Sequence, residues 1–292
     1  MELERAAVTY GRTAMLQILL LCGAGAFAPP QLRHHRCAPR RAASQNQAAN
    51  PETKITSDYV ATLFDSFAEN FEEVLESLDY CAPKFVGDAV AALAASRAEP
   101  YGACLDAGCG TGLAAHGLRP HVAALYGVDL SPDMARLAEE LCYEDGPENP
   151  PSRSEAAARR AMGWPLLYDG VSVGNLLDLS SVDGLPEGAF DLVVAADVLC
   201  YFGDLEPVVA GLAARLAPGG DLVFSVETLP EGDYSWVLQC QERYAHDDAY
   251  VARVAAAAGL GVVEQTRFQP RTESGYPVRG TLHVLRKRKY SI

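Results

Sequence analysis

Between residues 56 and 98, apolar residues recur at spacings of three and four, which is the repeat of helices that bury one face. Thr56 or Ser57 can cap the first helix, and Pro83 can open the last one. The pattern therefore predicts several helices in a row, and we assign residues 51–100 to an N-terminal helical cap.

From residue 101 onward, short apolar runs alternate with amphipathic segments. The run at 190–199 contains little polar alternation, which is typical of a strand covered on both faces. Strands that alternate with helices predict an α/β fold with a parallel sheet. The predicted strands are residues 103–105, 125–129, 171–175, 190–199, 221–226, 261–265 and 280–286.

The most specific pattern is ACLDAGCGTG, at residues 103–112. Glycine at alternate positions permits φ > 0 and leaves no Cβ between the main chain and a ligand. A dinucleotide fingerprint starting at Gly108 would need glycine at position 113, where the chain has Leu113, and a phosphate-binding loop would need lysine after Gly112. The remaining pattern, D-x-G-x-G-x-G, resembles motif I of class I S-adenosylmethionine (SAM) dependent methyltransferases.

Two further matches follow in the order of that family. Asp129 ends the next predicted strand, where one carboxylate can accept from both hydroxyls of a ribose. The Ala-Pro-Gly-Gly turn at 217–220 resembles the turn that precedes the family's fifth strand. The resemblance covers residues 58–287. It implies a Rossmann-like, seven-stranded, mostly parallel sheet with an antiparallel last strand, and a SAM-binding domain at residues 101–292.

The resemblance also implies which residues hold the cofactor. Asn175 stands where relatives carry an acid that accepts from the adenine amino group, with Asp178 as the alternative. Residues 196–201 resemble motif IV but lack the (Asp/Asn)-Pro-Pro-(Tyr/Phe) tetrad, which argues against DNA as substrate. The predicted cofactor-binding residues are Asp106, Gly108, Cys109, Gly110, Gly112, Asp129, Leu130, Met134, Asn175, Leu176, Ala196 and Asp197.

The acceptor side resembles a small-molecule subgroup that often carries tetratricopeptide repeats, which need a period of about 34 residues that this chain lacks. The matching residues include Arg243 and His246, and later Arg271 and Glu273. A cleft beside SAM lined by arginine, histidine and tyrosine suits a carboxylate or phenolate, because arginine binds carboxylates bidentately. The predicted substrate-binding residues are Arg243, Tyr244 and Arg271, and the candidate general bases are His246, Tyr201 and Glu227. His246 is equally a candidate partner for the cap of the following helix.

The composition of the chain limits the classes of molecule that it is expected to bind. The 292 residues carry a net charge of −14, and the first 45 residues hold six arginines against two glutamates, so the remainder is still more acidic. Such a body repels phosphate backbones, and we expect no nucleic-acid partner. The eight cysteines show no C-x-x-C pair or metal-ligand spacing, so no metal site is predicted. A small molecule remains as the expected partner, and the oligomeric state stays open.

Residues 1–50 are predicted to be a targeting leader and linker. The apolar run 14–28 is shorter than the roughly 20 residues needed to span a bilayer and is typical of a signal peptide. The acid-free, arginine-rich stretch 29–44 is typical of a transit peptide. Because the junction at 25–29 resembles that of bipartite leaders in algae with secondary plastids, we expect a plastid location, with the secretory pathway as the alternative. No membrane association is expected after the leader is removed.

Residues 144–168 are predicted to be an insertion, with a helix at 154–162 and with Trp164 and Tyr168 as candidates for either substrate contacts or surface positions. The function that the resemblance implies is SAM-dependent methyl transfer to an oxygen or nitrogen of a small molecule. The alternative is a SAM-binding regulatory or assembly protein without transferase activity. A nicotinamide dehydrogenase is disfavoured by Leu113.

Overall fold

The computed structural model describes residues 55–142, 158, 161–230, 234–239, 241–273 and 275–289. The predicted leader, and most of the predicted helix at 154–162, lie outside these residues. Within the described ranges, no helix is both long and apolar enough to cross a membrane.

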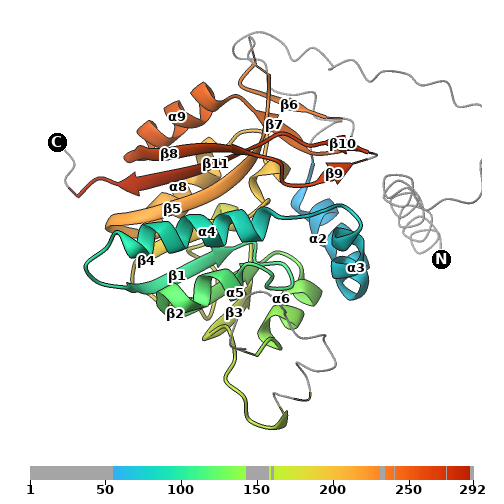
Figure 1. Cartoon of the computed structure of the whole chain (residues 1–292), viewed down its shortest axis with the longest axis vertical. Coiled ribbons are helices and arrows are strands. Elements are labelled where there is room, and N and C mark those ends of the chain that lie inside the picture. The colour runs from blue at the N-terminus through green and yellow to red at the C-terminus, as the bar shows by residue number, and fades with distance from the viewer. Residues whose placement is uncertain are drawn as a thin grey trace, which may run out of the picture.

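A central sheet runs in the order β3-β2-β1-β4-β5-β11-β8 (Figure 1). The first five strands pair in parallel, and β11 pairs antiparallel with both of its neighbours. The predicted seven-stranded sheet with an antiparallel last strand is therefore confirmed. Its strands are β1 (Tyr101–Ala107), β2 (Val122–Asp129), β3 (Gly170–Val173), β4 (Phe190–Ala195), β5 (Leu216–Thr228), β8 (Leu260–Phe268) and β11 (Gly280–Lys287).

Four short strands were not predicted. The strands β6 (Trp236–Leu238) and β7 (Tyr244–His246) pair with each other, and β7 also pairs with the end of β5. The hairpin of β9 (Thr272–Glu273) and β10 (Tyr276–Pro277) follows β8 and precedes β11 along the chain. The β6–β7 pair extends the sheet at the carboxyl end of β5, where acceptor residues were predicted, and β9 and β10 form a separate two-stranded sheet.

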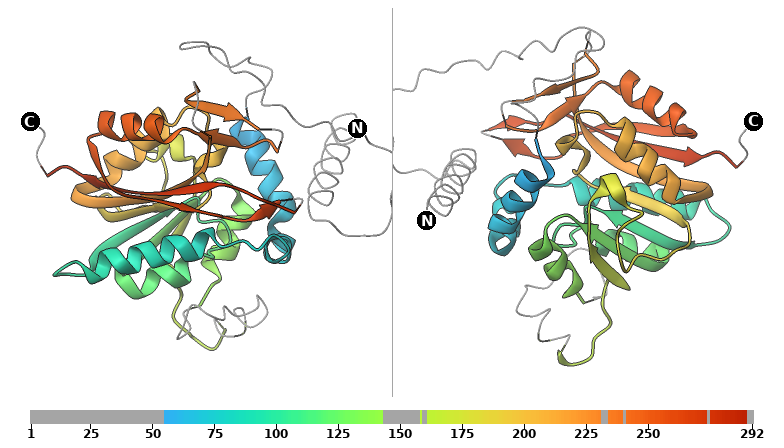
Figure 2. Two further views of the ribbon diagram at one scale, coloured as in Figure 1. Left: turned by 45° about the horizontal axis from the view of Figure 1, so that its top comes forward. Right: turned by 180° about the vertical axis from the view of Figure 1, so that it is seen from behind.

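Helices cover both faces of the sheet, as Figure 1 and the view from behind in Figure 2 show. One face packs against α4 (Ala82–Ala95) and α5 (Ala115–Leu118), and the other packs against α8 (Glu206–Arg215) and α9 (Asp248–Ala257). Alternate residues of β4 enter opposite layers, so the whole strand reads as one apolar run.

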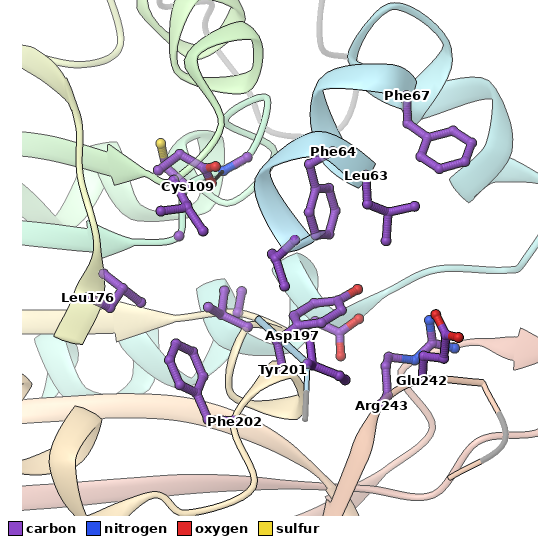
Figure 3. A pocket seen from close by; sticks show the side chains of 18 of the residues that line it. Leu63, Phe64, Phe67, Cys109, Leu176, Asp197, Tyr201, Phe202, Glu242 and Arg243 are labelled. Carbon is purple, nitrogen blue, oxygen red and sulfur yellow. Dashed lines mark hydrogen bonds between the residues drawn. The ribbon is translucent and has the colours of Figure 1, made fainter. Parts of the chain in front are cut away.

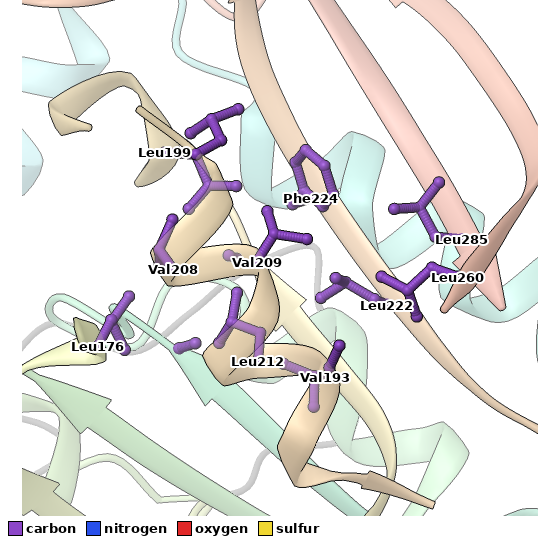
Figure 4. Packing of buried hydrophobic residues seen from close by; sticks show 14 of the residues in the cluster. Leu176, Val193, Leu199, Val208, Val209, Leu212, Leu222, Phe224, Leu260 and Leu285 are labelled. Atoms are coloured by element: carbon purple, nitrogen blue, oxygen red, sulfur yellow. The ribbon is translucent and has the colours of Figure 1, made fainter. Parts of the chain in front are cut away.

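The layer on the α8 side is closely packed (Figure 4). Val209 and Leu212 of α8 share a buried cluster with Leu222 and Phe224 of β5 and Leu285 of β11. Burying one such side chain stabilises the fold by about 1.5–3 kcal/mol. This packing stabilises the strands whose ends carry the predicted site residues.

The strand β5 begins earlier than predicted. Phe190 pairs with Leu216, and after a bulge Leu192 pairs with Asp221. The Pro-Gly-Gly turn therefore lies within the paired segment instead of preceding it.

The region predicted as the cap contains α2 (Ser57–Phe67), the 3-10 turn η2 (Ala68–Asn70) and α3 (Phe71–Glu76), which form the cap, and then α4, which belongs to the layer on the sheet. Thr56 caps α2 by accepting from the amide of Tyr59, as the sequence suggested. None of the residues of α2 is fully buried, although one face of the helix is apolar. That face is turned towards a cavity.

Candidate active site

A cavity of about 960 Å³ lies under the cap at the carboxyl ends of β1, β2 and β4 (Figure 3). In an open α/β sheet, ligands bind at this edge. The volume is near the upper end of the range of about 300–1,000 Å³ for small-molecule sites. The cavity can therefore hold two ligands side by side.

The glycine loop presents bare main chain to one end of this cavity. Gly108 and Gly110 have φ of 77° and 55°, in the region that favours glycine. A Cβ at Gly108 would approach the side chain of Val198 to 2.6 Å, whereas a Cβ at Gly110 would meet nothing nearer than 4.0 Å. Gly108 thus allows close packing of the loop, and Gly110 leaves space for a ligand.

Asp129 closes the loop from the end of β2. Its carboxylate accepts from the amide of Gly110 at 2.8 Å and from the amide of Ser131 at 2.9 Å. Burial raises its pKa, and these two amide bonds oppose that shift. Each carboxylate oxygen keeps further acceptor capacity on the cavity side, so Asp129 can still receive two hydroxyls.

Asp106 lies deeper, at the end of β1. Its Oδ2 accepts from the hydroxyl of Tyr168 at 2.7 Å, while Oδ1 is buried and has no hydrogen-bond partner among the described residues. Burial raises the pKa of Asp106 to about 7, and the bond from Tyr168 opposes the shift. A buried acceptor without a partner is costly, so Oδ1 is suited to a cationic ligand group.

Most of the predicted cofactor residues line the cavity, and Gly112 and Met134 do not. Gly112 is in the core, where a Cβ would approach Leu141 to 2.5 Å. Met134 is fully buried beside Leu137 and Ala68. Both predictions are corrected, because these residues support the loop and α6 (Pro132–Glu139) from behind.

Of the two residues predicted for the adenine contact, only Asn175 lines the cavity. The side-chain oxygen of Asn175 accepts from the amide of Leu177 at 2.9 Å, and its nitrogen donates to Ser57 at 3.2 Å. Asn175 lines the cavity, but it also caps η4 (Leu176–Asp178) and fastens the cap. The alternative, Asp178, is exposed and does not line the cavity.

The opposite end of the cavity has an ionic wall. Arg271 is 3% exposed and pairs through Nη1 with Asp197 at 2.7 Å and through Nε with Glu273 at 2.6 Å. Its Nη2 pairs with Glu227. Arg243 pairs with Glu227 at 2.9 Å and also with Glu273. We call these five residues the ionic wall.

A family model described as "Methyltransferase domain" matches residues 74–265. The match covers more than half of the chain and includes the glycine loop, Asp129 and the Pro-Gly-Gly turn. The chain belongs to the methyltransferase-domain family. The predicted SAM-dependent class is confirmed, and with it SAM as the cofactor.

Curated relatives are distant. The ubiquinone biosynthesis O-methyltransferase of Thiobacillus denitrificans is 27% identical over 175 residues, which cover 56% of this chain and 66% of that protein. Nodulation protein S of Rhizobium tropici is 31% identical over 128 residues, or 43% of either protein. The chain therefore spans less than two thirds of the length of these relatives.

A solved structure shows the same fold. It is the 1,6-didemethyltoxoflavin-N1-methyltransferase of Burkholderia thailandensis with bound 1,6-didemethyltoxoflavin and S-adenosylhomocysteine. The TM-score is 0.57 at 19% identity, over 89% of this chain and 100% of that one.

Two of the three candidate bases of this methyltransferase domain are not at the cavity. His246 is fully buried and donates from its ring to the carbonyl oxygen of Phe202 at 2.8 Å, and burial lowers its pKa to about 4. Glu227 lies behind the arginines, where it accepts from Arg243, Arg271 and Gln239. Neither side chain lines the cavity, so both predictions are corrected.

Tyr201 does line the methyltransferase cavity, where its ring packs edge-on against Phe64 of the cap at 5.4 Å (Figure 3). Burial raises its pKa, so the phenol keeps its proton at neutral pH. Its position is as predicted, but its chemistry is that of an aromatic wall and a hydrogen-bond donor.

Arg243, Tyr244 and Arg271, the predicted substrate-binding residues, line the cavity at the end opposite the glycine loop. The carboxylates of the ionic wall already hold all three guanidinium nitrogens of Arg271, and Nε and Nη2 of Arg243, so the expected bidentate contact with a substrate is corrected for Arg271. No bidentate edge of Arg271 is left for a substrate carboxylate.

Three contributions were missed or misplaced. Tyr80 lines the cavity, and burial together with nearby Asp197 raises its pKa. Glu242, at the rim, accepts from Tyr59 of the cap and has φ of 59°. Tyr168 is buried against Asp106 and does not contact the cavity. No local pattern signalled these contacts, because each joins segments distant in sequence.

Proposed function

We propose that this protein transfers the methyl group of SAM to a small-molecule acceptor held in the same cavity. The observation that carries the proposal is continuity: the glycine loop with Asp129 and the ionic wall with its aromatic neighbours are two ends of one cavity. When bound, SAM supplies a sulfonium methyl that is already activated. The protein's task is therefore to hold and align two reactants.

The residues divide this task. Asp129 holds the ribose hydroxyls, the main chain at Gly110 permits close approach, and Asp106 receives the ammonium group through Oδ1. The acceptor lies between the ionic wall and the apolar face of α2.

The cap limits the size of the acceptor and excludes water. It is fastened to the body by Ser57 to Asn175, by Glu69 to Arg136 at 3.0 Å, and by Asp65 to Ser131. A cavity closed by a cap suits a metabolite better than the side chain of a folded protein, which supports a small-molecule acceptor.

The proposal is tested with the full chain. Calorimetry with S-adenosylhomocysteine should show one site, and incubation with methyl-labelled SAM and a small-molecule extract should give a labelled product. Asp129→Ala should weaken cofactor binding by about 100-fold or more and reduce the yield of labelled product. Absence of cofactor binding overturns the proposal, and binding without any labelled product supports the regulatory alternative.

We also propose delivery to a plastid, on the strength of the leader at residues 1–50. A fluorescent protein fused behind these residues should enter the plastid of an alga with secondary plastids. Export of the fusion would instead support the secretory alternative.

A further inference from the structure

We infer that the methyl acceptor is a nitrogen base on an aromatic or apolar body, and that carboxylic acids are excluded. The inference rests on the proposed function and adds the chemical class of the substrate. It replaces the carboxylate or phenolate acceptor that the sequence suggested.

The first observation is the charge of the ionic wall. Its three carboxylates, Asp197, Glu227 and Glu273, face two arginines, which leaves one negative charge in excess. The wall is largely buried, and Coulomb interactions are stronger there than in water. A cation placed beside the wall is therefore stabilised, and an anion is repelled.

The second observation is the occupancy of the arginines. All three guanidinium nitrogens of Arg271 take part in ion pairs, and Arg243 uses Nε and Nη2. At Arg271 a substrate carboxylate would have to displace a carboxylate of the protein, and at Arg243 only Nη1 is outside these ion pairs. That exchange would leave a buried charge without its partner, which is strongly unfavourable.

The third observation is the absence of other cations. The described residues that line the cavity carry six carboxylates and two arginines, and no lysine or histidine. Two of the carboxylates, Asp106 and Asp129, belong to the cofactor end. Asp204 and Glu242 lie nearer the rim, and both add negative charge. Among the described lining residues, an anionic acceptor would meet no cation that is free of a carboxylate partner.

The remaining lining is aromatic. Rings from the cap and from the strand ends surround the space in front of the ionic wall (Figure 3). They include Tyr59, Phe64, Phe67, Tyr80, Tyr201 and Phe202. Aromatic faces attract cations and pack against flat apolar groups. The acceptor should therefore combine a ring or apolar body with a basic nitrogen.

The chemistry agrees with this electrostatic preference. The nitrogen lone pair forms the new N–C bond, the methyl C–S bond breaks, and its electron pair stays on sulfur, which becomes a neutral thioether. The positive charge moves to nitrogen, beside the carboxylates. A protonated amine first loses its proton to water. A phenol would have to become an anion next to the same carboxylates, which raises its pKa.

The test uses three matched pairs of probes: phenethylamine and 3-phenylpropanoate, tryptamine and 3-indolepropanoate, and quinoline and 2-naphthoate. Binding to the full chain saturated with S-adenosylhomocysteine is measured by calorimetry, and label transfer is measured from methyl-labelled SAM. We expect the nitrogen base of at least one pair to bind about tenfold or more tightly than its acid, and to be the labelled member.

Equal or tighter binding of the acids overturns the inference, as does failure of all six probes. S-adenosylhomocysteine is titrated first in the same cell, so cofactor binding is established before any probe is added. Either result would therefore contradict the substrate class without contradicting the proposed methyltransferase function.

A variant pair sharpens the test. Glu273→Gln removes the excess negative charge of the ionic wall, and we expect it to reduce the base-over-acid preference by about tenfold. Glu139→Gln removes the same charge from an exposed position on α6 and should leave the preference unchanged. The preference is a ratio measured on folded protein, so a loss of stability alone does not alter it. An unchanged ratio in Glu273→Gln contradicts the role of the wall.

Discussion

The two ends of the cavity are built in different ways. At the cofactor end, a main-chain amide and a carboxylate within one strand-loop-helix-strand unit hold one another, and the bond from Gly110 to Asp129 joins positions only 19 residues apart. At the acceptor end, side chains from separate segments meet: Arg271 binds Asp197 across 74 positions and Glu227 across 44.

The difference shows where each end obtains its geometry. The glycine loop is fixed by its own sequence, whereas Arg271 is placed by neighbours on both sides. The amide of Cys81 donates to the carbonyl of Pro270 at 2.9 Å, and the amide of Thr272 donates to the carbonyl of Leu78 at 2.7 Å. The cap thus positions the ionic wall. Substitutions at the two ends of the cavity should therefore have different consequences.

The largest effect is expected from Arg271→Ala. The change leaves three carboxylates of the ionic wall with one arginine, and removing one partner from a buried ion pair costs about 3–5 kcal/mol. Urea denaturation should show this loss of unfolding free energy. Lys84→Ala, at an exposed pair with Asp88, should cost less than about 1 kcal/mol. Equal losses in the two variants would mean that the ionic wall is not a structural centre.

The next largest effect is expected on cofactor affinity, at the cofactor end of the cavity. Asp129→Ala should weaken S-adenosylhomocysteine by about 100-fold or more, because two charge-assisted hydrogen bonds of about 1.5–3 kcal/mol each are lost. Asp129→Asn keeps one acceptor oxygen and should recover part of the affinity. Calorimetry measures both variants. Full affinity in Asp129→Ala would remove the basis of the cofactor assignment.

The same contrast explains what the sequence could predict. The sheet, its antiparallel last strand and the glycine loop follow from local patterns: apolar runs, glycine spacing and an acid at a strand end. These patterns also placed Asp129 and Asp106 at the cavity. Even here, Gly112 and Met134 were assigned to the ligand although they are buried behind the loop.

The acceptor end could not be predicted to the same extent. Residue types suggested His246 and Glu227 as bases and Arg271 as a free cation, but their partners come from other segments. His246 is on the short strand β7, and Glu227 is held by Gln239 and Arg243 from the connection between β6 and β7 and by Arg271 from the residue before β9. Tyr168 was assigned to an insertion, yet it holds Asp106 from 62 positions away.

A pH dependence separates the ends further. The pKa of Asp106 is about 7 in the folded protein, so the carboxylate that receives the cofactor ammonium forms as the pH rises. S-adenosylhomocysteine should bind up to about tenfold more tightly at pH 8 than at pH 6. Asp106→Asn should bind weakly and with little pH dependence. A wild-type affinity that does not change between pH 6 and pH 8 would contradict this role.

Ionisation of Asp106 strengthens cofactor binding but lowers the stability of the fold. Because the folded pKa is raised above the unfolded value, the stability that Asp106 contributes is present below pH 4 and is lost as the pH rises through about 7. Asp106→Asn should therefore gain stability relative to the wild type between pH 6 and pH 8, measured as the change in urea midpoint. Ionised Asp106 lowers the unfolding free energy of the protein without cofactor, as expected for a buried carboxylate that binds a cationic ligand group.

The smallest effect is expected at the join between the cap and the acceptor end. Tyr59→Phe removes the hydroxyl that binds Glu242 but keeps the ring in the cavity. One such bond to a charged group at an exposed rim is worth about 0.5–1.5 kcal/mol, so the acceptor KM should rise by roughly threefold to tenfold. Affinity for S-adenosylhomocysteine should stay within about twofold, because Glu242 does not contact the glycine loop. Ser66→Ala removes only a bond within α2 and serves as the control. If Tyr59→Phe weakens cofactor and acceptor alike, the two ends are coupled through the cap and cannot be treated as separate sites.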